Sequence, residues 1–310
     1  MKTVLVDRSF NGYAFPADVQ VKIVSCRTVA EYDRDESVAA IAGSRAMAAA
    51  CEKMLFPGLK LYQLTSAGFD GVPCDAFAQK GVAVANAGTV YSAPIAETVV
   101  FGILSIAKKL RKDPKNRRLK YLRHYRYITE LFDKKVIILG AGNIGTAVAE
   151  RLAGFGMTID GYDPYCPEKK SYARILRNRE ELLAAMATYD YVVSTLPDTE
   201  QTKGFIDKAL LERMKNTAVL VNVGRKAAIE EKDLYIALKK KCIGGAVLDM
   251  FEKIPNPITN PFRRLRNVIV LPGVAAISKE VDVRLKTHMH RNILCAIEGE
   301  PISNVINGVK

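Results

Sequence analysis

The sequence predicts an α/β protein with two domains, each built on a parallel sheet that helices cover. The chain has 310 residues, 49% of them apolar, which is enough for two domains with buried cores. Short runs rich in β-branched residues alternate with helical runs, an order that is typical of parallel sheets. Near the middle of the chain, a glycine-rich run follows an apolar strand and opens a helix.

The first predicted domain begins with five short strands and the helices between them. Strands are expected at residues 3–7, 21–25, 39–43, 59–65 and 82–86, with helices at 44–54 and 74–80. A long helix follows at 92–110, and Pro94 fits its first turn because no helical hydrogen bond is needed there. We expect residues 1–92 and 277–310 to form one flavodoxin-like α/β domain, which would hold the substrate.

The second predicted domain, residues 93–276, holds six further strands. They are expected at 135–139, 158–162, 191–196, 218–223, 243–248 and 267–271, with helices at 144–153, 179–187, 208–214 and 231–240. Six strands with helical crossovers match a doubly wound Rossmann domain. The last helix, at 279–298, cannot extend this sheet, so we expect it to pack on the first domain.

The run Gly140-Ala141-Gly142-Asn143-Ile144-Gly145 has the pattern of a dinucleotide-binding turn. Gly140 allows a tight turn, Gly142 lets a pyrophosphate come close, and Gly145 lets the helix pack on the strand. The N-terminus of the following helix would face the phosphates. The alternative is a glycine-rich turn in some other α/β protein, but the buried strand before the run favours the nucleotide site.

Asp163 ends the next predicted strand, in the place where a carboxylate binds the 2′-hydroxyl of an adenosine ribose. Its negative charge would repel a 2′-phosphate, so NAD is favoured over NADP as the cofactor. Lys169 and Lys170 lie close enough in sequence to leave NADP open.

Several other short stretches form a recognisable set. They are Ser66-Ala67-Gly68-Phe69-Asp70, Asn86-Ala87-Gly88 with Pro94-Ile95-Ala96-Glu97, Leu196-Pro197 with Glu200 and Thr202, Val221-Asn222-Val223-Gly224-Arg225, and residues 244–252 and 292–304. Together with the glycine run, they resemble the D-isomer-specific 2-hydroxyacid dehydrogenases over nearly the whole chain. The resemblance implies hydride transfer between NAD(H) and a small 2-hydroxy or 2-oxo carboxylate.

The resemblance also implies roles for particular residues. The backbone amides of Ala67 and Gly68 would hold the substrate carboxylate, and Arg225 would bridge that carboxylate and the 2-oxo group as the catalytic residue. The cofactor-binding set outside the glycine run and Asp163 would comprise Leu196, Pro197, Thr202, Val223, Gly224 and Asp249, the last three beside the nicotinamide. Members of the family are typically homodimers through the nucleotide domain.

The chain departs from the family's pattern at the acid–base pair. The family uses a histidine oriented by a glutamate, and the matching positions here are Gly273 and Ile254. Arg225 cannot donate the proton at neutral pH, because the pKa of a guanidinium is far too high. Losing a positioned acid typically costs about 10²–10⁴ in rate.

Three outcomes of this loss stay open. Another donor, such as Lys279, a tyrosine or a bound water, could serve a different substrate; turnover could be slow or absent; or the substrate could need no such acid. His288 and His290 are interpreted as solvated or satisfied histidines. The alternative to a working enzyme is a catalytically impaired sensor of NAD or another ligand, or an interaction protein.

Composition narrows the remaining classes. The net charge is +13, and ten Lys or Arg residues fall between positions 108 and 126. We interpret this basic run as a solvated connector, because no nucleic-acid-binding motif accompanies it. The six cysteines are scattered and no apolar stretch is long enough for a membrane span. We therefore expect a reduced, cytoplasmic protein without a metal site or a membrane partner.

Overall fold

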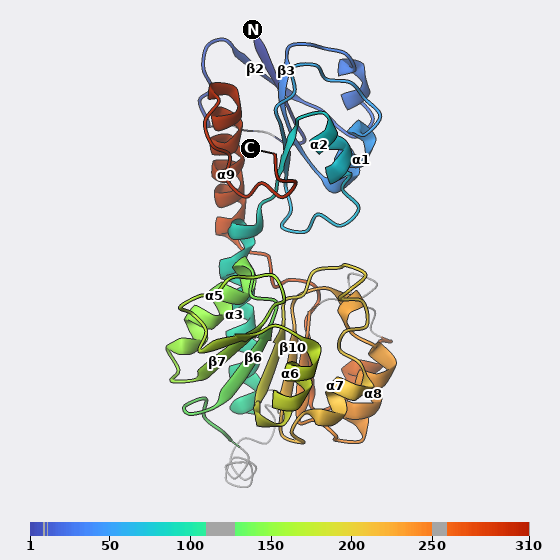
Figure 1. Ribbon diagram of the computed structural model, residues 1–310, viewed down its shortest axis with the longest axis vertical. Coiled ribbons are helices and arrows are strands. Elements are labelled where there is room, and N and C mark those ends of the chain that lie inside the picture. Colours follow the sequence, from blue (N-terminus) through green and yellow to red (C-terminus); the bar gives the residue numbers. More distant parts are fainter. Residues whose placement is uncertain (9, 11, 110–127, 250–258, 310) are drawn as a thin grey trace. The chain divides into compact units, whose positions relative to one another are not determined.

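The computed structural model describes the chain except for residues 9, 11, 110–127, 250–258 and 310. The described residues form two compact units (Figure 1). Unit 1 comprises Met1–Tyr91 and Ser278–Lys310, and unit 2 comprises Ser92–Ile277. Each unit has its own parallel sheet and its own core, and each is described by itself below.

Unit 1 contains a five-stranded sheet in the order β2-β1-β3-β4-β5, in which every neighbouring pair is parallel. Its strands are β1 (Lys2–Val6), β2 (Val19–Ile23), β3 (Val38–Gly43), β4 (Leu61–Leu64) and β5 (Ala83–Ala85). Its helices are α1 (Arg45–Cys51), α2 (Cys74–Gln79), α9 (Lys279–Glu298) and the short η1 (Val29–Tyr32). This strand order is that of the flavodoxin-like fold, as expected from the sequence.

Two hydrophobic clusters cover the two faces of this sheet, because successive side chains of a strand point to opposite sides. Val4 and Val6 pack with Met289 and Ile293 of α9 on one face. Leu5 and its neighbours on the other face pack with α1 and α2. The C-terminal helix therefore covers one face of the sheet of unit 1, although it lies some 200 residues beyond the last strand of that unit.

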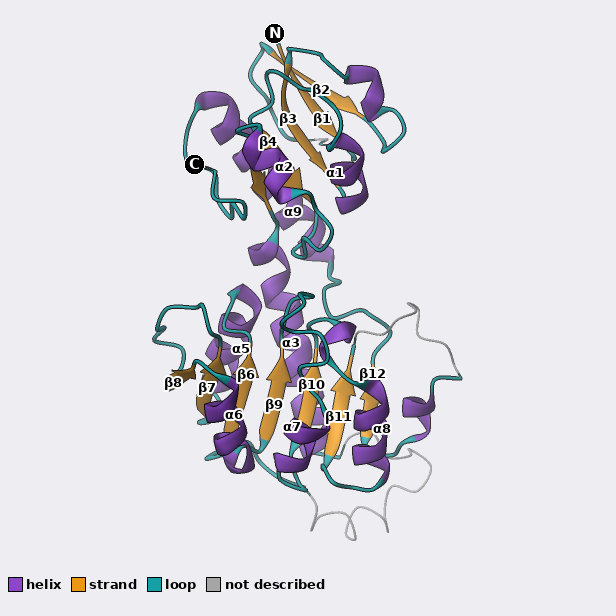
Figure 2. Cartoon of the chain, turned by 45° about the vertical axis from the view of Figure 1, so that its right-hand side comes forward, coloured by secondary structure: helices purple, strands orange, loops and turns teal. Residues whose placement is uncertain are grey.

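Unit 2 contains a seven-stranded sheet in the order β12-β11-β10-β9-β6-β7-β8. Figure 2 shows the arrows of its strands pointing the same way, and every pair is parallel. The strands are β6 (Lys135–Leu139), β7 (Thr158–Tyr162), β8 (Arg174–Leu176), β9 (Tyr191–Ser194), β10 (Val219–Asn222), β11 (Gly245–Leu248) and β12 (Val268–Val270). Its first six strands in sequence follow the 3-2-1-4-5-6 order of the Rossmann fold, and β12 extends the sheet.

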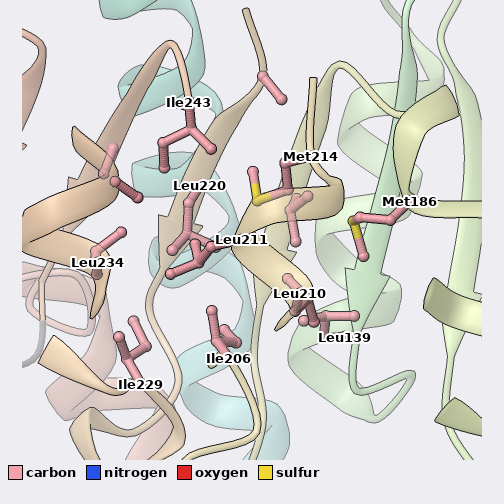
Figure 3. Close-up of a cluster of buried hydrophobic side chains, with 14 of the residues drawn as sticks. Leu139, Met186, Ile206, Leu210, Leu211, Met214, Leu220, Ile229, Leu234 and Ile243 are labelled. Atoms are coloured by element: carbon pink, nitrogen blue, oxygen red, sulfur yellow. The ribbon is translucent and has the colours of Figure 1, made fainter. Parts of the chain in front are cut away.

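Helices lie on both faces of this second sheet (Figure 2). They are α3 (Gly88–Ala107, mostly in this unit), α5 (Asn143–Ala153), α6 (Arg179–Ala185), α7 (Lys208–Arg213) and α8 (Glu231–Lys239), with short turns η4 (Met186–Thr188), η5 (Lys226–Ala228) and η6 (Pro261–Arg264). Figure 3 shows Leu210 and Leu211 of α7 packed with Leu139, Leu220 and other buried residues.

The structure differs from the sequence prediction in two elements. Strand β8 was not expected, because three residues at the edge of a sheet are too few to show a pattern. Helix α3 begins at Gly88, whose N–H donates to the Asn86 side chain (3.1 Å), so Pro94 lies inside the helix and not in its first turn. Within the described residues, α3 alone is long and apolar enough to cross a membrane, but 56% of its most apolar window is buried, as in a core helix.

Candidate functional site

The glycine turn between β6 and α5 has the geometry that its sequence predicts. Gly140 has φ +93°, a backbone conformation that favours glycine. A Cβ atom at Gly145 would stand 2.1 Å from the carbonyl oxygen of Gly140, whereas one at Gly142 would meet nothing within 4 Å. No side chain caps α5 at Gly142. The first amides of the helix are thus open to an anion such as a pyrophosphate.

Asp163 lies directly after β7, and its side chain is hydrogen-bonded to the glycine turn. Its carboxylate accepts the N–H groups of Ala141, Tyr165 and Cys166, each at 3.0 Å. Lys169 contacts the turn as well, with Nζ donating to the Ala141 carbonyl (2.6 Å) and to the Thr146 hydroxyl. Since a carboxylate has about four acceptor positions, Asp163 keeps one for a ribose hydroxyl.

The loops after β9 and β10 pack tightly against each other. The amides of Val223 and Gly224 both donate to the carbonyl of Ser194 (3.1 and 3.0 Å). A Cβ atom at Gly224 would stand 2.7 Å from the carbonyl oxygen of Leu196, so only glycine fits there. The Thr202 hydroxyl donates to the carbonyl of Pro197 (2.7 Å) and closes the first of these loops. The predicted cofactor residues therefore gather at the carboxyl ends of parallel strands.

Asp249, at the end of β11, is 3% exposed and accepts two backbone hydrogen bonds. The donors are the N–H groups of Val274 (2.9 Å) and Ala275 (3.2 Å). These bonds fix the loop that contains Gly273, whose φ is +79°. A histidine at position 273 would have to adopt a conformation that L-residues rarely take. The sequence did not predict that Asp249 fixes this loop.

Arg225 follows β10 and is half-buried. Its carbonyl accepts hydrogen bonds from the Asn222 side-chain amide and the Ala228 N–H, both at 3.3 Å, which fixes its backbone at the strand end. Beside it, the buried side-chain oxygens of Ser194 and Asn222 have no hydrogen-bond partner within the described residues. Sequence reasoning assigned these two oxygens no role, although a polar residue at the last position of a buried strand was a usable signal.

In unit 1, the loop after β4 is fixed by three hydrogen bonds to its carbonyls. Tyr91 donates its hydroxyl to Thr65 (2.6 Å), Asn86 its amide to Ala67 (2.9 Å), and Ser66 its hydroxyl to Gly68 (2.7 Å). The N–H groups of Ala67 and Gly68 donate to no described residue. The loop thus presents two ordered, unused donors, the arrangement that a carboxylate needs.

His288 of α9 supports this loop indirectly. Its Nε2 lies 3.0 Å from the carbonyl of Asn86, the residue whose side chain holds Ala67. Burial lowers the pKa of the His288 imidazole, and the nearby charge of Arg291 adds to this shift, although the hydrogen bond to Asn86 opposes it. The sequence could not reveal this contact, because the two residues are 202 positions apart.

A comparison with protein families identifies most of the second unit. Residues 100–275, more than half of the chain, match the family model described as "D-isomer specific 2-hydroxyacid dehydrogenase, NAD binding domain". The chain belongs to the D-isomer specific 2-hydroxyacid dehydrogenase family. The resemblance noted in the sequence is therefore confirmed at the level of the family, and the chain is homologous to NAD(P)-dependent oxidoreductases.

Curated relatives agree with this family. A D-3-phosphoglycerate dehydrogenase of Methanocaldococcus jannaschii is 32% identical over 80% of this chain, which spans only 48% of that protein. A glyoxylate/hydroxypyruvate reductase B of Yersinia pestis is 30% identical over 82% of this chain and 79% of its own length.

Solved structures give the same two-domain fold. A family member from Aeromonas salmonicida superimposes with a TM-score of 0.76 at 26% identity, with 98% of each chain covered. The D-mandelate dehydrogenase of Rhodotorula graminis reaches 0.81 at 19% identity, covering 98% of this chain and 97% of its own. The predicted fold class, a Rossmann domain with a flavodoxin-like domain, is thereby confirmed.

Some predicted features of this dehydrogenase homologue fall outside the described residues. Ile254 is one of them, and so is nearly all of the basic run at 108–126. Where the structure describes the chain, no group of three His, Cys, Asp or Glu side chains is placed to hold a metal ion. All six cysteines are free thiols.

Proposed function

We propose that this protein transfers a hydride between NAD(H) and a small 2-hydroxy or 2-oxo carboxylate, with altered or weak acid–base chemistry. The observation that carries the proposal is the pair of unused amides at Ala67 and Gly68, held in place by three side-chain hydrogen bonds. Together with membership of the family, this pair supports a carboxylate ligand. The curated reductase of Yersinia pestis suggests glyoxylate and hydroxypyruvate as first substrates to test.

Unit 2 would bind the dinucleotide, which supplies or accepts the hydride when bound. The open space over Gly142 and the uncapped start of α5 fit a pyrophosphate. Asp163 has one acceptor position left for a ribose hydroxyl, and its charge favours NAD over NADP. Because structures similar in fold include complexes with NADPH and NADP, Lys169 is the residue that could weaken this preference.

Arg225 would grip the substrate carboxylate and polarise the 2-oxo group as negative charge builds on its oxygen. The proton must come from elsewhere, because Gly273 has no side chain and Ile254 has no titratable group. Lys279, a tyrosine or a water molecule would then serve as the donor. We expect turnover that is slow relative to an enzyme with a positioned acid, by about 10²–10⁴.

A second candidate function is a sensor that binds NAD and a carboxylate without turnover. The observation that favours it is the Asp249 carboxylate, whose two backbone hydrogen bonds fix the loop around Gly273 at a φ that a histidine would rarely adopt. Binding of NADH and of a 2-oxo acid without any NADH oxidation would select this function. Oxidation that is lost in the Arg225→Gln variant would select the dehydrogenase.

Three further features belong to the same proposal. Unit 1 would be the substrate domain, unit 2 the nucleotide domain, and two copies would associate through unit 2. Exposed aromatic side chains on unit 2, Phe101 and Phe132, support the dimer because large apolar groups on a surface often mark an interface. Sedimentation at micromolar concentration tests the dimer.

The six free thiols fit a reducing compartment such as the cytoplasm.

A further inference from the structure

Arg8 lies at the same edge of the first sheet as the carboxylate loop. Strands β1, β3 and β4 are in register, with Val6 beside Ala42 and Ala42 beside Gln63. The ladder continues one residue further, since Asp7 N–H donates to the Ala42 carbonyl and Thr65 N–H to the Gly43 carbonyl. With strands about 4.8 Å apart, the backbones of Arg8 and Thr65 lie about 10 Å from each other.

This edge is also where the strand order of the sheet reverses. In the order β2-β1-β3-β4-β5, the reversal falls between β1 and β3. Ligands of open parallel sheets bind at the carboxyl ends of the strands on either side of such a point. Arg8 follows β1 and Arg45 follows β3, so each of the two flanking strands is followed by an arginine.

The two arginines differ in how their guanidinium groups are used. Arg45 donates Nη1 to the Asp70 carboxylate (2.9 Å) and carbonyl (3.5 Å). Arg8 donates only Nε, to the Asp7 carboxylate (3.0 Å), and its side chain is 34% exposed. Its two terminal nitrogens donate to none of the described residues. Asp7 therefore orients the guanidinium through Nε, and the two terminal nitrogens are left to bind a ligand.

The charge of Arg8 acts on the Tyr91 phenol, which is hydrogen-bonded to the carboxylate loop. Burial raises the pKa of the Tyr91 phenol, and the positive charge of Arg8 counteracts this rise, while Asp282 and Asp7 reinforce it. The Tyr91 hydroxyl donates to the Thr65 carbonyl at 2.6 Å. The Arg8 guanidinium is thus within electrostatic reach of the loop that presents the Ala67 and Gly68 amides.

We propose that Arg8 binds a second anionic group, at the end of the substrate opposite its reacting 2-oxo acid. This inference rests on the proposed function, in which the Ala67 and Gly68 amides take the first carboxylate. The substrate class is then a 2-oxo or 2-hydroxy acid with a distal carboxylate or phosphate. Either group suits a guanidinium fork, which forms two parallel hydrogen bonds with planar or tetrahedral oxyanions.

The test compares ligands that differ in the distal group alone. The probes are 2-oxobutyrate, oxaloacetate and 3-phosphohydroxypyruvate, measured both by NADH oxidation and by calorimetric binding to NADH-saturated protein. Wild type should bind one or both of the dianionic acids more tightly than 2-oxobutyrate. The better of the two identifies the distal group as a carboxylate or a phosphate.

Arg8→Gln should weaken binding of the favoured dianionic acid by about 10- to 100-fold, the range expected for charge-assisted hydrogen bonds. Binding of 2-oxobutyrate should change less than about 3-fold by the same reasoning. Arg8→Lys, which keeps the charge but not the fork, should lie between the two and covers the case in which Arg8→Gln does not fold. Arg34→Gln, at an exposed arginine before β3 and so at the opposite end of the sheet, is the matched control.

Equal losses for the monoanionic and dianionic acids, or no loss in Arg8→Gln, would overturn the proposal. The two readouts separate it from the proposed function. Oxidation of NADH by 2-oxobutyrate with no effect of Arg8 removes this inference and keeps the dehydrogenase. Arg8-dependent binding of a dianionic acid without NADH oxidation keeps this inference and removes the dehydrogenase.

Discussion

Two loops at the carboxyl edge of the second sheet differ in how well they match the pattern of a 2-hydroxyacid dehydrogenase. The turn after β6 has the glycine geometry predicted for a dinucleotide-binding turn, including the close approach of Gly145 to the Gly140 carbonyl. The loop after β12 has Gly273 at a φ of +79°, at the position where we propose that the family's proton donor is missing. Under the proposed function, this contrast means that cofactor binding and proton transfer can change independently, because they depend on different loops of one sheet.

The largest expected effect concerns the first loop. Gly145→Ala places a Cβ atom 2.1 Å from a backbone oxygen, so the turn must shift away from its phosphate-binding geometry. We expect NADH affinity to fall at least about 100-fold, because each hydrogen bond lost between an amide and the charged pyrophosphate costs about 1.5–3 kcal/mol. Fluorescence titration of NADH measures this. Gly154→Ala, at the other end of α5, is the matched control, because its Cβ would meet no atom closer than 3.5 Å.

Asp163→Asn changes the choice of cofactor. Both affinities should fall, since an amide cannot accept all three backbone hydrogen bonds that the carboxylate accepts. Removing the negative charge should nevertheless shift the ratio of NADPH to NADH affinity by about 10-fold toward NADPH. Asp207→Asn, in the same unit but at the start of α7, should leave the ratio unchanged. An unchanged ratio in Asp163→Asn would refute the assigned NAD preference.

Gly273→Ala tests the second loop. Because φ at position 273 is +79°, an alanine there should lower the free energy of unfolding by about 1–2 kcal/mol. Urea denaturation of unit 2 measures the loss, with Gly154→Ala again as the control because its φ is −62°. If Gly273→Ala were as stable as wild type, the loop would be free to accept other side chains.

The smallest effect comes from His288 in unit 1. Burial lowers the pKa of this imidazole in the folded state, while the unfolded chain keeps the ordinary value near 6.5. As the pH falls below about 6.5, the unfolded state takes up the proton first, so the free energy of unfolding decreases. Partial exposure limits the decrease to less than about 1 kcal/mol. Hydrogen exchange of unit 1 at pH 5 and pH 8 should show this difference in wild type and not in His288→Gln.

The sequence predicted the features that depend on residues close together in the chain, and it missed those that depend on contacts between distant residues. The glycine turn at 140–145 follows from backbone geometry within six residues, and the two parallel sheets follow from the βα alternation. Two other features were invisible in the sequence. The bond from His288 to Asn86 joins distant positions, and the grip of Asp249 on Val274 and Ala275 depends on how β11 and β12 pair. Strand β8 was missed because three edge residues carry no periodicity.

The most direct test of the account is NADH oxidation with glyoxylate and hydroxypyruvate, measured at saturating cofactor in wild type and in Arg225→Gln. The account predicts slow oxidation in wild type and a further loss of about 10²–10³ in the variant, as for removal of an oxyanion donor. Wild-type protein that binds NADH but oxidises none of it with any 2-oxo acid would contradict the dehydrogenase. Equal rates in wild type and variant would contradict the role of Arg225.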